Sequence, residues 1–420
     1  MREREFIRRV HEAGGKAYIA GGWPRDRLRG VPAKDKDYVL SGLTCDTFLE
    51  LFPGAIQTGK SFPVFRLRID GVHSDVALAR SETKTGPGYR GFTVRFTPDT
   101  TIRDDLYRRD TTINSMAISL QTGALIDPYG GERDIAGGII RATSEHFTDD
   151  PVRALRAARQ AAQLGFRIEA GTLAMMRACR GELGSEPKER LLKELALALR
   201  ANRPSDFFYA LQSAGILDVT YPPIAALVGV EQRESFHPEG DAFTHTMIAL
   251  DKAAALTPRP EVRFAVLAHD LGKGATPLEM IPHHFGHERR GLDVLKAWNR
   301  EMTLPRSWLL CASFGVKEHM RACTITRMGK ILDLILRLSR HPLGFDGFAA
   351  LMLADGGELP PYLENYERFL EAARSIDARN APPDLRGPQI GAWLREQQIK
   401  AAAKVARTLP ALVHDMSQEG

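Results

Sequence analysis

The sequence predicts an α+β unit at the N-terminus, followed by a long region that is almost entirely helical. Up to about residue 140, short apolar runs such as KAYIA, DYVLSG and VFRLRI alternate with helical segments. This alternation is typical of a mixed sheet flanked by helices. After about residue 146, segments such as VRALRAARQAAQLGF carry apolar residues at helical spacing, which favours helices packed on helices.

Length and composition limit the class of protein. A chain of 420 residues with 43% hydrophobic and 26% charged residues is globular and long enough for two to four structural units. The net charge of +5 and the pI of about 9.0 weakly indicate a polyanionic partner. Four scattered cysteines argue against a disulfide framework. Without an apolar signal core or a membrane-length run, the sequence indicates a soluble cytoplasmic protein with no membrane partner.

Changes in pattern divide the chain into four predicted domains. They are an α+β head (1–140), a helical neck and body (141–227), a histidine-rich helical domain (228–355) and a polar helical tail (356–420). The third domain holds eight of the twelve histidines of the chain, namely His237, His245, His269, His283, His284, His287, His319 and His341.

Two aspartates stand at the start of an apolar run in the head. If Asp35 and Asp37 share one face of a strand, they lie roughly 6–7 Å apart, a spacing that suits carboxylates holding divalent ions. Carboxylates and substrate phosphates are the ligands that Mg²⁺ prefers. The alternative is a solvated strand edge. An upstream glycine turn, Gly21-Gly22, followed by Arg25, favours phosphate binding nearby. Asp75, on another apolar strand, is either a third metal carboxylate or an edge residue.

A second polar cluster lies in LYRRDTTINSMA. Asp110 and Asn114 are four residues apart and would share a helix face, with Arg108 and Arg109 just before them. The alternative is a solvated helix start.

Five segments of the sequence occur in a fixed order: GGWPRDRLRGVPAKDKDYVLSG, DVALARSETKTGPGYRGF, RRDTTINSMA, DPYGGERDIAGGIIR and DDPVRALRAARQAAQLGF. From about residue 17 to about residue 355, the chain resembles the bacterial tRNA nucleotidyltransferases, the CCA-adding enzymes of the polymerase-beta-like superfamily. The resemblance implies a polymerase-beta-like nucleotidyltransferase head, then an all-helical neck and body. It implies template-independent addition of CCA to the 3′ end of tRNA from CTP and ATP, with Mg²⁺.

The resemblance also assigns roles to residues. Asp35 and Asp37 match the metal ligands of the family, and Asp75 matches its third catalytic carboxylate. The family's nucleotide-binding positions match Gly22, Arg25, Arg109, Arg156 and Arg159, and Asp110 matches a position that reads the ribose. The chain departs from the family at Trp23-Pro24, where two small or aliphatic residues are usual, and at Gln160, where an aromatic residue commonly follows the arginine.

Selection of the nucleotide is predicted for the segment DDPVRALRAAR. Asp150, Arg153, Arg156 and Arg159 are spaced by three and would form a slowly winding stripe on a helix. Asp150 accepts and Arg153 donates hydrogen bonds, so together they can imitate a Watson–Crick edge that fits C and A but not U and G. The resemblance implies that this pair replaces a nucleic-acid template. The alternative role of Asp149 or Asp150 is to cap the helix.

The glycine-rich segment ETKTGPGYRGFT is predicted to be a loop. In the family, a flexible loop at this place is needed for the final A, so its presence favours full CCA addition. An A-adding enzyme or a poly(A) polymerase stays as the alternative.

The histidine-rich domain carries a second predicted site. His245, the adjacent His269-Asp270 and Asp355 form an H…HD…D pattern that resembles the HD phosphohydrolase superfamily. Imidazole and carboxylate ligands together suit a transition metal better than magnesium. His283, His284, His287 and His319 are candidates for a second metal or for a phosphate contact, or are surface histidines.

Some CCA-adding enzymes carry such a domain fused at this position. There it is linked to phosphatase, 2′-nucleotidase and 2′,3′-cyclic phosphodiesterase activities.

Two alternative functions of another class are an RNA-binding HD phosphohydrolase with an inactive transferase and a phosphatase acting on free nucleotides. tRNA would be gripped by its shape and backbone, because no base-reading module is present. The sequence leaves monomer and homodimer undecided.

Overall fold

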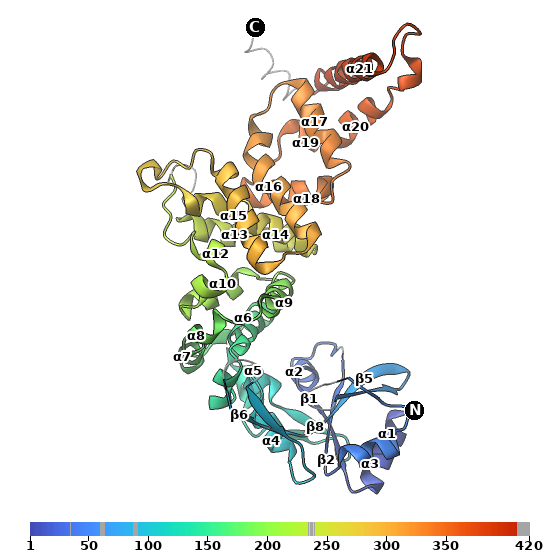
Figure 1. Cartoon of the computed structure of the whole chain (residues 1–420), viewed down its shortest axis with the longest axis vertical. Helices are drawn as coiled ribbons and strands as arrows, with labels where there is room; N and C mark the ends of the chain where they lie inside the picture. The colour runs from blue at the N-terminus through green and yellow to red at the C-terminus, as the bar shows by residue number, and fades with distance from the viewer. Residues whose placement is uncertain are drawn as a thin grey trace. The chain divides into compact units, whose positions relative to one another are not determined.

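The computed structural model describes residues 1–33, 35–58, 64–86, 91–233, 235, 238 and 240–409. His237 and positions 87–90 of the predicted loop lie outside them. The chain forms two compact units, residues 1–194 with 206–220 and residues 195–205 with 221–420. Figure 1 shows strands only in the first unit and helices throughout the second. The predicted fold class, a mixed-sheet head followed by helices, is confirmed. The division into four domains stays a prediction.

The head is built on a seven-stranded sheet with the order β3-β4-β5-β2-β1-β8-β9. The central pair β2 and β5 is parallel and the other pairs are antiparallel, so the sheet is mixed. The strands are β1 (Lys16–Ala20), β2 (Asp37–Ser41), β3 (Ile56–Gln57), β4 (Val64–Ile69), β5 (Val72–Leu78), β8 (Ala117–Ser119) and β9 (Leu125–Ile126).

Alternating side chains give this sheet two buried faces. Helices α1 (Glu3–Glu12) and α3 (Cys45–Leu51) cover one face, where Phe6, Phe48 and Phe65 are fully buried. The rings of Phe48 and Phe65 lie 4.4 Å apart. Helix α4 (Ile102–Tyr107) covers the other face through Ile102 and Leu106. The strand pairing brings the last residue of β1, the first residue of β2 and the middle of β5 close together, which positions Asp37 near Asp75.

Two local expectations for the head are wrong. Asp35 does not share a strand face with Asp37, because β2 begins at Asp37. Asp110 lies outside any helix, since only the short 3₁₀ helix η1 (Thr112–Asn114) forms there. The predicted glycine-rich loop joins β6 (Ser81–Lys84) to β7 (Phe92–Arg95), and its two ends, 82–84 and 92–93, pair with each other or with their neighbours as antiparallel strands.

The rest of the first unit consists of short elements and helices. They are α2 (Gly22–Leu28), α5 (Gly131–Ala136), β10 (Ile139–Ile140), η2 (Glu145–Asp149), α6 (Val152–Leu164), β11 (Arg167–Ile168), α7 (Ala170–Ala178), α8 (Arg180–Leu183) and α11 (Leu217–Thr220). Helices α9 (Lys188–Ala198) and α10 (Ser205–Ser213) cross the unit boundaries along the chain. Helix α6 presents alanines and Leu155 to the interior, which lets neighbouring helices pack closely.

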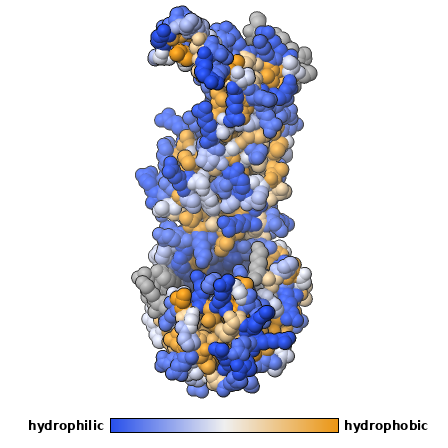
Figure 2. All heavy atoms as spheres, turned by 90° about the vertical axis from the view of Figure 1, so that its right-hand side faces the viewer, coloured by the Kyte–Doolittle hydropathy of each residue, from blue (hydrophilic) through white to orange (hydrophobic). Residues whose placement is uncertain are grey.

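The second unit is helical wherever it is regular. Its elements are α12 (Pro222–Ala225), α13 (Ala242–Leu256), α14 (Pro260–Ala268), η3 (Leu271–Ala275), η4 (Leu278–Met280), α15 (His287–Met302), α16 (Arg306–Thr324), α17 (Met328–Leu338), α18 (Gly344–Asp355), α19 (Pro361–Glu364), α20 (Tyr366–Arg374), η5 (Ala378–Asn380) and α21 (Pro388–Ala406). Among the residues that the structure describes, no helix has the length and apolarity needed to cross a membrane. Figure 2 shows polar side chains over most of the visible face, with apolar ones interspersed.

One glycine, Gly272, lets two segments of the second unit approach each other closely. A Cβ added to Gly272 would lie 1.8 Å from the carbonyl oxygen of His287, so no larger residue fits between η3 and the start of α15. This close approach brings the turn after Asp270 against the helix that carries His287. Glycine at this position therefore permits the close approach that brings His287 near Asp270.

Candidate nucleotide-binding site and histidine cluster

A polar cavity of about 620 Å³ lies in the first unit. It is lined by nine arginine and lysine side chains against four carboxylates, so its charge favours an anion as large as a nucleoside triphosphate. The cations are Arg25, Arg80, Arg108, Arg109, Arg153, Arg156, Arg159, Arg190 and Lys193, and the carboxylates are Asp37, Asp110, Asp150 and Glu194. Every predicted nucleotide-binding residue lines this cavity, Gly22 included.

Asp37 joins this cavity to a second one of about 510 Å³ that Asp35 and Asp75 also line. Burial raises the pKa of Asp37; Arg109 opposes the rise, and Asp75 and Asp35 add to it. Asp75 also faces Arg66 at 3.4 Å, but both side chains are about half exposed. Three carboxylates that repel one another at an open cleft form a donor set that fits a hard divalent cation.

The two arginines before Asp110 are fixed by one buried acid. Asp105 is 1% exposed, and its two oxygens accept from Arg108 at 2.5 Å and from Arg109 at 2.9 Å. Burial opposes ionisation of Asp105, but the two guanidinium groups lower its pKa to about 2. Burial and the nearby Arg108 lower the pKa of Arg80 to about 10, so it still carries its charge at neutral pH. The cationic wall is therefore held in place without a ligand.

The floor of the cavity is a buried network around Asp110. Arg156 donates to Asp110 at 2.8 Å, and the amide of Gln160 donates to the same carboxylate at 3.1 Å. Gln160 accepts in turn from the hydroxyl of Thr111 at 2.7 Å. Burial opposes ionisation of Asp110, yet Arg156 holds its pKa below the ordinary range. Gln160, a departure from the family pattern, thus acts as a hydrogen-bonding partner of a predicted site residue.

Asp150 and Arg153 both line the cavity but do not pair with each other. Asp150 accepts from Arg190 at 2.6 Å and from the backbone N–H of Val152 at 3.2 Å. Arg153 donates to the carbonyl of His146 at 2.5 Å. The ring of His146 in turn pairs with Asp149, the other candidate cap. Asp150 therefore supports the first turn of α6 and faces the cavity, so its two predicted roles are compatible.

The glycine turn and Arg25 complete the cavity. Gly21 has a φ of +83°, and a Cβ there would lie 3.1 Å from Arg109, so glycine lets the backbone approach this guanidinium. Arg25 donates to the side-chain oxygen of Asn114 at 2.8 Å. Trp23 packs against the head core, with Arg27 5.5 Å from its ring centroid.

Several lining residues were not predicted from sequence. Arg190, Lys193 and Glu194 lie on α9, about forty residues after Asp150, and Arg159 donates to Glu194 at 2.6 Å. Their segment, KERLLKELALALRA, reads only as an amphipathic helix. No local signal distinguishes a site-facing arginine from a solvated one in such a helix.

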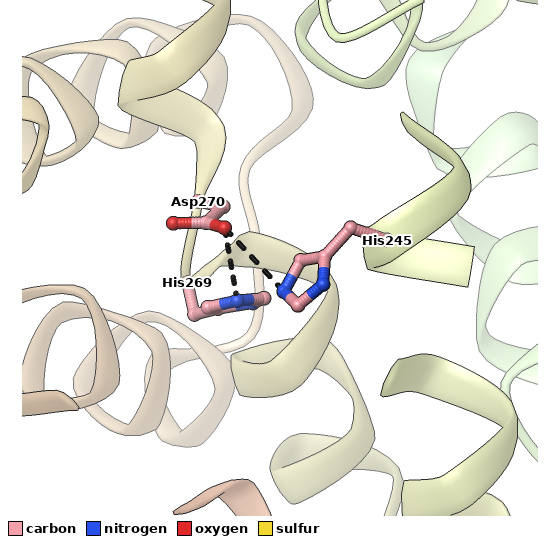
Figure 3. A group of neighbouring side chains, drawn as sticks. All are labelled: His245, His269 and Asp270. Atoms are coloured by element: carbon pink, nitrogen blue, oxygen red, sulfur yellow. Dashed lines mark ion pairs between the residues drawn. The ribbon is translucent and has the colours of Figure 1, made fainter. Parts of the chain in front are cut away.

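In the second unit, the predicted H…HD…D residues come together. Figure 3 shows His245, from α13, pointing toward His269 and Asp270, which directly follow α14. Nε2 of His269 lies 3.2 Å from Asp270, and Nε2 of His245 lies 3.7 Å from the same carboxylate. Asp355, the last residue of α18, faces His245 at 3.1 Å and His269 at 3.5 Å. The four side chains converge from three helices on one point.

Asp270 also faces a second pair of histidines. His287 and His319, both buried, lie 3.3 Å and 3.6 Å from its other oxygen and 3.2 Å from each other. His283 and His284 point elsewhere: His283 accepts from Arg233, and His284 contacts Thr276 and the carbonyl of Glu231. Of the four additional histidines predicted as candidates, two therefore join the cluster.

The cluster has the chemistry of a cation site. His269 Nε2 and Asp270 Oδ1 are buried without a hydrogen-bond partner among the described residues. Burial disfavours protonation of His269, but Asp270 and Asp355 raise its pKa to about 10. Burial opposes ionisation of Asp270, yet His269 and Lys273, the latter at 2.6 Å, hold its pKa well below the usual range. Such a set of buried N and O donors fits a transition metal. Lys273, which was not predicted, lies one helical turn after Asp270.

Two segments of the chain match known protein families. Residues 17–141 match the family described as the poly A polymerase head domain, and residues 165–227 match one described as a probable RNA- and SrmB-binding site of polymerase A. The sheet and the three carboxylates Asp35, Asp37 and Asp75 thus lie in a segment that matches the poly A polymerase head domain.

Full-length relatives define the family more closely. The multifunctional CCA protein of Nitrosococcus oceani is 40% identical over 407 residues, covering 94% of this chain and 99% of that protein. That of Stenotrophomonas maltophilia is 41% identical, covering 92% of this chain and 99% of that protein. The chain belongs to the family of multifunctional CCA proteins.

Solved structures agree with the fold. A CCA-adding enzyme in complex with ATP matches with a TM-score of 0.65 and 21% identity, covering 95% of this chain and 88% of that chain. The Thermotoga maritima CCA-adding enzyme complexed with tRNA matches with a TM-score of 0.58 and 21% identity, covering 94% of this chain and 89% of that one. At such identities these matches speak for the fold alone.

Proposed function

We propose that this chain adds CCA to the 3′ end of tRNA, using CTP and ATP. The observation that carries the proposal is one cavity lined by arginines, by Asp150 and Arg153, and by Asp37, one of the predicted metal ligands. The names of the full-length relatives support CCA addition over the making of a long A tail.

In this reaction the 3′-hydroxyl oxygen of tRNA bonds to the α-phosphorus of the incoming triphosphate, and pyrophosphate leaves. Asp35 and Asp37 would hold Mg²⁺, and Asp75 would accept the proton of the attacking hydroxyl. When bound, the metal neutralises charge on the phosphates and aligns the reacting groups. Arg25, Arg109 and the adjoining arginines bind the phosphates by charge and by hydrogen bonds. Asp110 would bind the ribose from its fixed position on Arg156 and Gln160.

Product analysis on a tRNA lacking its 3′ end tests the proposal. We expect CTP alone to extend the RNA by two nucleotides, and CTP with ATP to extend it by three. A long A tail would identify a poly(A) polymerase instead. Addition of a single A, only to an RNA that already ends in CC, would identify an A-adding enzyme.

We infer a second activity, metal-dependent phosphohydrolysis by an HD-type site in the second unit. Asp270 Oδ1 and His269 Nε2 favour it, because both atoms are buried without a hydrogen bond among the described residues, which is costly unless a ligand satisfies them. His245, His269, Asp270 and Asp355 would hold a transition metal, and His287 and His319 face the same Asp270. A metal in such a site lowers the pKa of a bound water for attack on phosphorus.

Metal analysis and hydrolysis assays test this activity without involving the transferase. Elemental analysis of the purified chain should find a bound transition metal, and 2′,3′-cyclic AMP or p-nitrophenyl phosphate should be hydrolysed in its presence. A chain that holds no metal and hydrolyses neither probe, yet adds CCA, would reduce the cluster to a structural role.

A further inference from the structure

A basic groove lies between α16 and α17 of the second unit, apart from the histidine cluster. Its volume is about 820 Å³. It is lined by Ser313, Phe314, Lys317, Arg321, Asp333, Leu336, Arg337, Arg340 and His341. Four cationic side chains line it, three from the two helices and Arg340 from the turn after α17, and the only lining carboxylate, Asp333, pairs with Arg395 at 2.6 Å. The groove therefore carries excess positive charge.

Two of these cations, Arg321 and Arg337, form ion pairs with one buried acid. Glu318 is fully buried, and its two oxygens accept from Arg321 at 2.6 Å and from Arg337 at 2.8 Å. The arginine side chains are still 34% and 41% exposed, so the guanidinium groups present further N–H donors to the groove. Phe314 supports Arg337 from the side, 5.5 Å from its ring centroid. One carboxylate thus fixes a cation from each helix, and these cations are already positioned for an anion.

The other two cations, Lys317 and Arg340, are exposed and form no ion pair within the described part of the chain. Lys317 stands four residues before Arg321 on α16, and Arg340 stands three residues after Arg337 at the end of α17. Each therefore extends one member of the fixed pair by about one helical turn. The result is a two-sided row of cations rather than a pocket for one small ion.

We propose that this groove binds the phosphate backbone of tRNA. A row of guanidinium and ammonium groups suits contacts to the phosphate backbone, because its charge is readable by any RNA sequence and the Phe314 ring, only 8% exposed, is not free to stack on a base. The proposal rests on tRNA being the substrate, as proposed above. It gives the second unit a part in holding the RNA that depends neither on the histidine cluster nor on the nucleotide cavity.

The double variant Lys317→Ala with Arg340→Ala tests the groove in the full-length chain. Neither side chain forms an ion pair or hydrogen bond with another described residue, so their loss should not disturb the fold. With a tRNA transcript lacking its CCA end, we expect the Kd to rise roughly tenfold at 0.15 M salt. The slope of log K against log salt should fall by about 1.4–1.8, since each lost phosphate contact removes about 0.7–0.9. The KM for CTP and the rate at saturating tRNA should stay unchanged.

The control removes the same charge elsewhere. Lys296→Ala with Arg300→Ala takes two exposed cations from α15 of the same unit, and binding should stay near wild type. Equal weakening in both double variants would show a net-charge effect and overturn the groove. Wild-type binding by the groove variant would overturn it as well, even if CCA addition is established. Conversely, selective loss of tRNA binding would support the groove in a chain that proves not to add CCA.

The Glu318→Gln variant tests whether Glu318 positions the two arginines, because two explanations predict opposite changes in tRNA affinity. The variant gains one positive charge, so simple charge attraction predicts tighter tRNA binding. Loss of the acid that fixes Arg321 and Arg337 predicts weaker binding instead, which is the result we expect. Tighter binding would overturn the role of Glu318 in positioning the pair. A thermal melt, compared with that of the wild type, identifies a folding defect.

Discussion

The two candidate metal sites of this chain are built in opposite ways. In the head, Asp35, Asp37 and Asp75 are exposed carboxylates at a strand edge, and the fixed groups around them are arginines. In the second unit, His269, Asp270 and their partners are buried and face one another at 3.1–3.7 Å. An open, all-oxygen edge suits a Mg²⁺ that arrives with its nucleotide, whereas a closed nitrogen and oxygen cluster suits a resident metal. The burial of the ligands therefore separates a site suited to an ion that arrives with its substrate from one suited to a resident ion.

Loss of the strand-edge carboxylate should have the largest effect. Asp37→Asn keeps the shape but removes the charge that would hold Mg²⁺. We expect nucleotide addition to fall about 10³-fold or more, because a metal contact contributes several kcal/mol to the transition state. The melting temperature should not fall, because the Asp37 carboxylate is repelled by Asp75 and Asp35 and forms no side-chain hydrogen bond or ion pair among the described residues. Primer-extension rates beside thermal melts check this, with Asp99→Asn as the control. Near-wild-type nucleotide addition by Asp37→Asn would contradict a role of Asp37 as a metal ligand.

Removal of metal should act on the second unit through stability. A metal present at about 1,000 times its Kd stabilises the folded state by about 4 kcal/mol, so chelation should lower the unfolding temperature of this unit. His269→Ala should lose the metal and the hydrolysis, while Mg²⁺-dependent CCA addition continues. Elemental analysis and calorimetry measure this, with the exposed His11→Ala as a control. Loss of both activities together in His269→Ala would contradict the independence of the two sites.

Nucleotide selection should weaken when the base-reading pair is altered. Arg153→Ala or Asp150→Ala should reduce the preference for CTP and ATP over UTP and GTP by about 10²-fold, because a site built to hydrogen-bond rejects mismatched partners strongly. Asp150→Ala should also cost about 1 kcal/mol of stability through its bond to the Val152 N–H. Single-nucleotide incorporation with all four triphosphates tests this.

Arg190 sharpens the same test. Arg190→Ala leaves Asp150 in place but removes its partner at 2.6 Å, so selection should weaken less than in Asp150→Ala. Arg180→Ala, which removes an exposed ion pair with Asp218, serves as the control. Unchanged discrimination in the Asp150, Arg153 and Arg190 variants would leave Asp150 as a helix support only.

The smallest effect is expected at Gln160. Gln160→Leu removes the amide that bridges Thr111 and Asp110 and leaves two buried groups with one partner fewer. We expect a loss of about 1–3 kcal/mol in the free energy of unfolding and only a modest rise in the KM for nucleotide. Chemical denaturation and steady-state kinetics measure the two. A large loss of kcat at unchanged stability would instead place Gln160 in direct contact with substrate.

The sequence by itself determined the class of fold and the local parts of both sites. Apolar periodicity distinguished the strands of the head from the helices that follow. Some site residues are close together in sequence, such as His269-Asp270 and the series Asp150, Arg153 and Arg156, so a short segment was enough to predict that they lie together. A resemblance over these segments then gave them chemical roles. Such signals are readable because neighbours in sequence have a fixed geometry once the local structure is known.

Only the tertiary structure decided which distant side chains meet. It paired Asp150 with Arg190 and Gln160 with Asp110, brought His287 and His319 but not His283 and His284 to Asp270, and set Glu318 beneath arginines from two helices. It also placed Asp35 before the start of β2 and paired the two ends of the predicted glycine-rich loop as strands. These outcomes depend on packing across long separations, where close approaches such as that at Gly272 fix the register and no local pattern does.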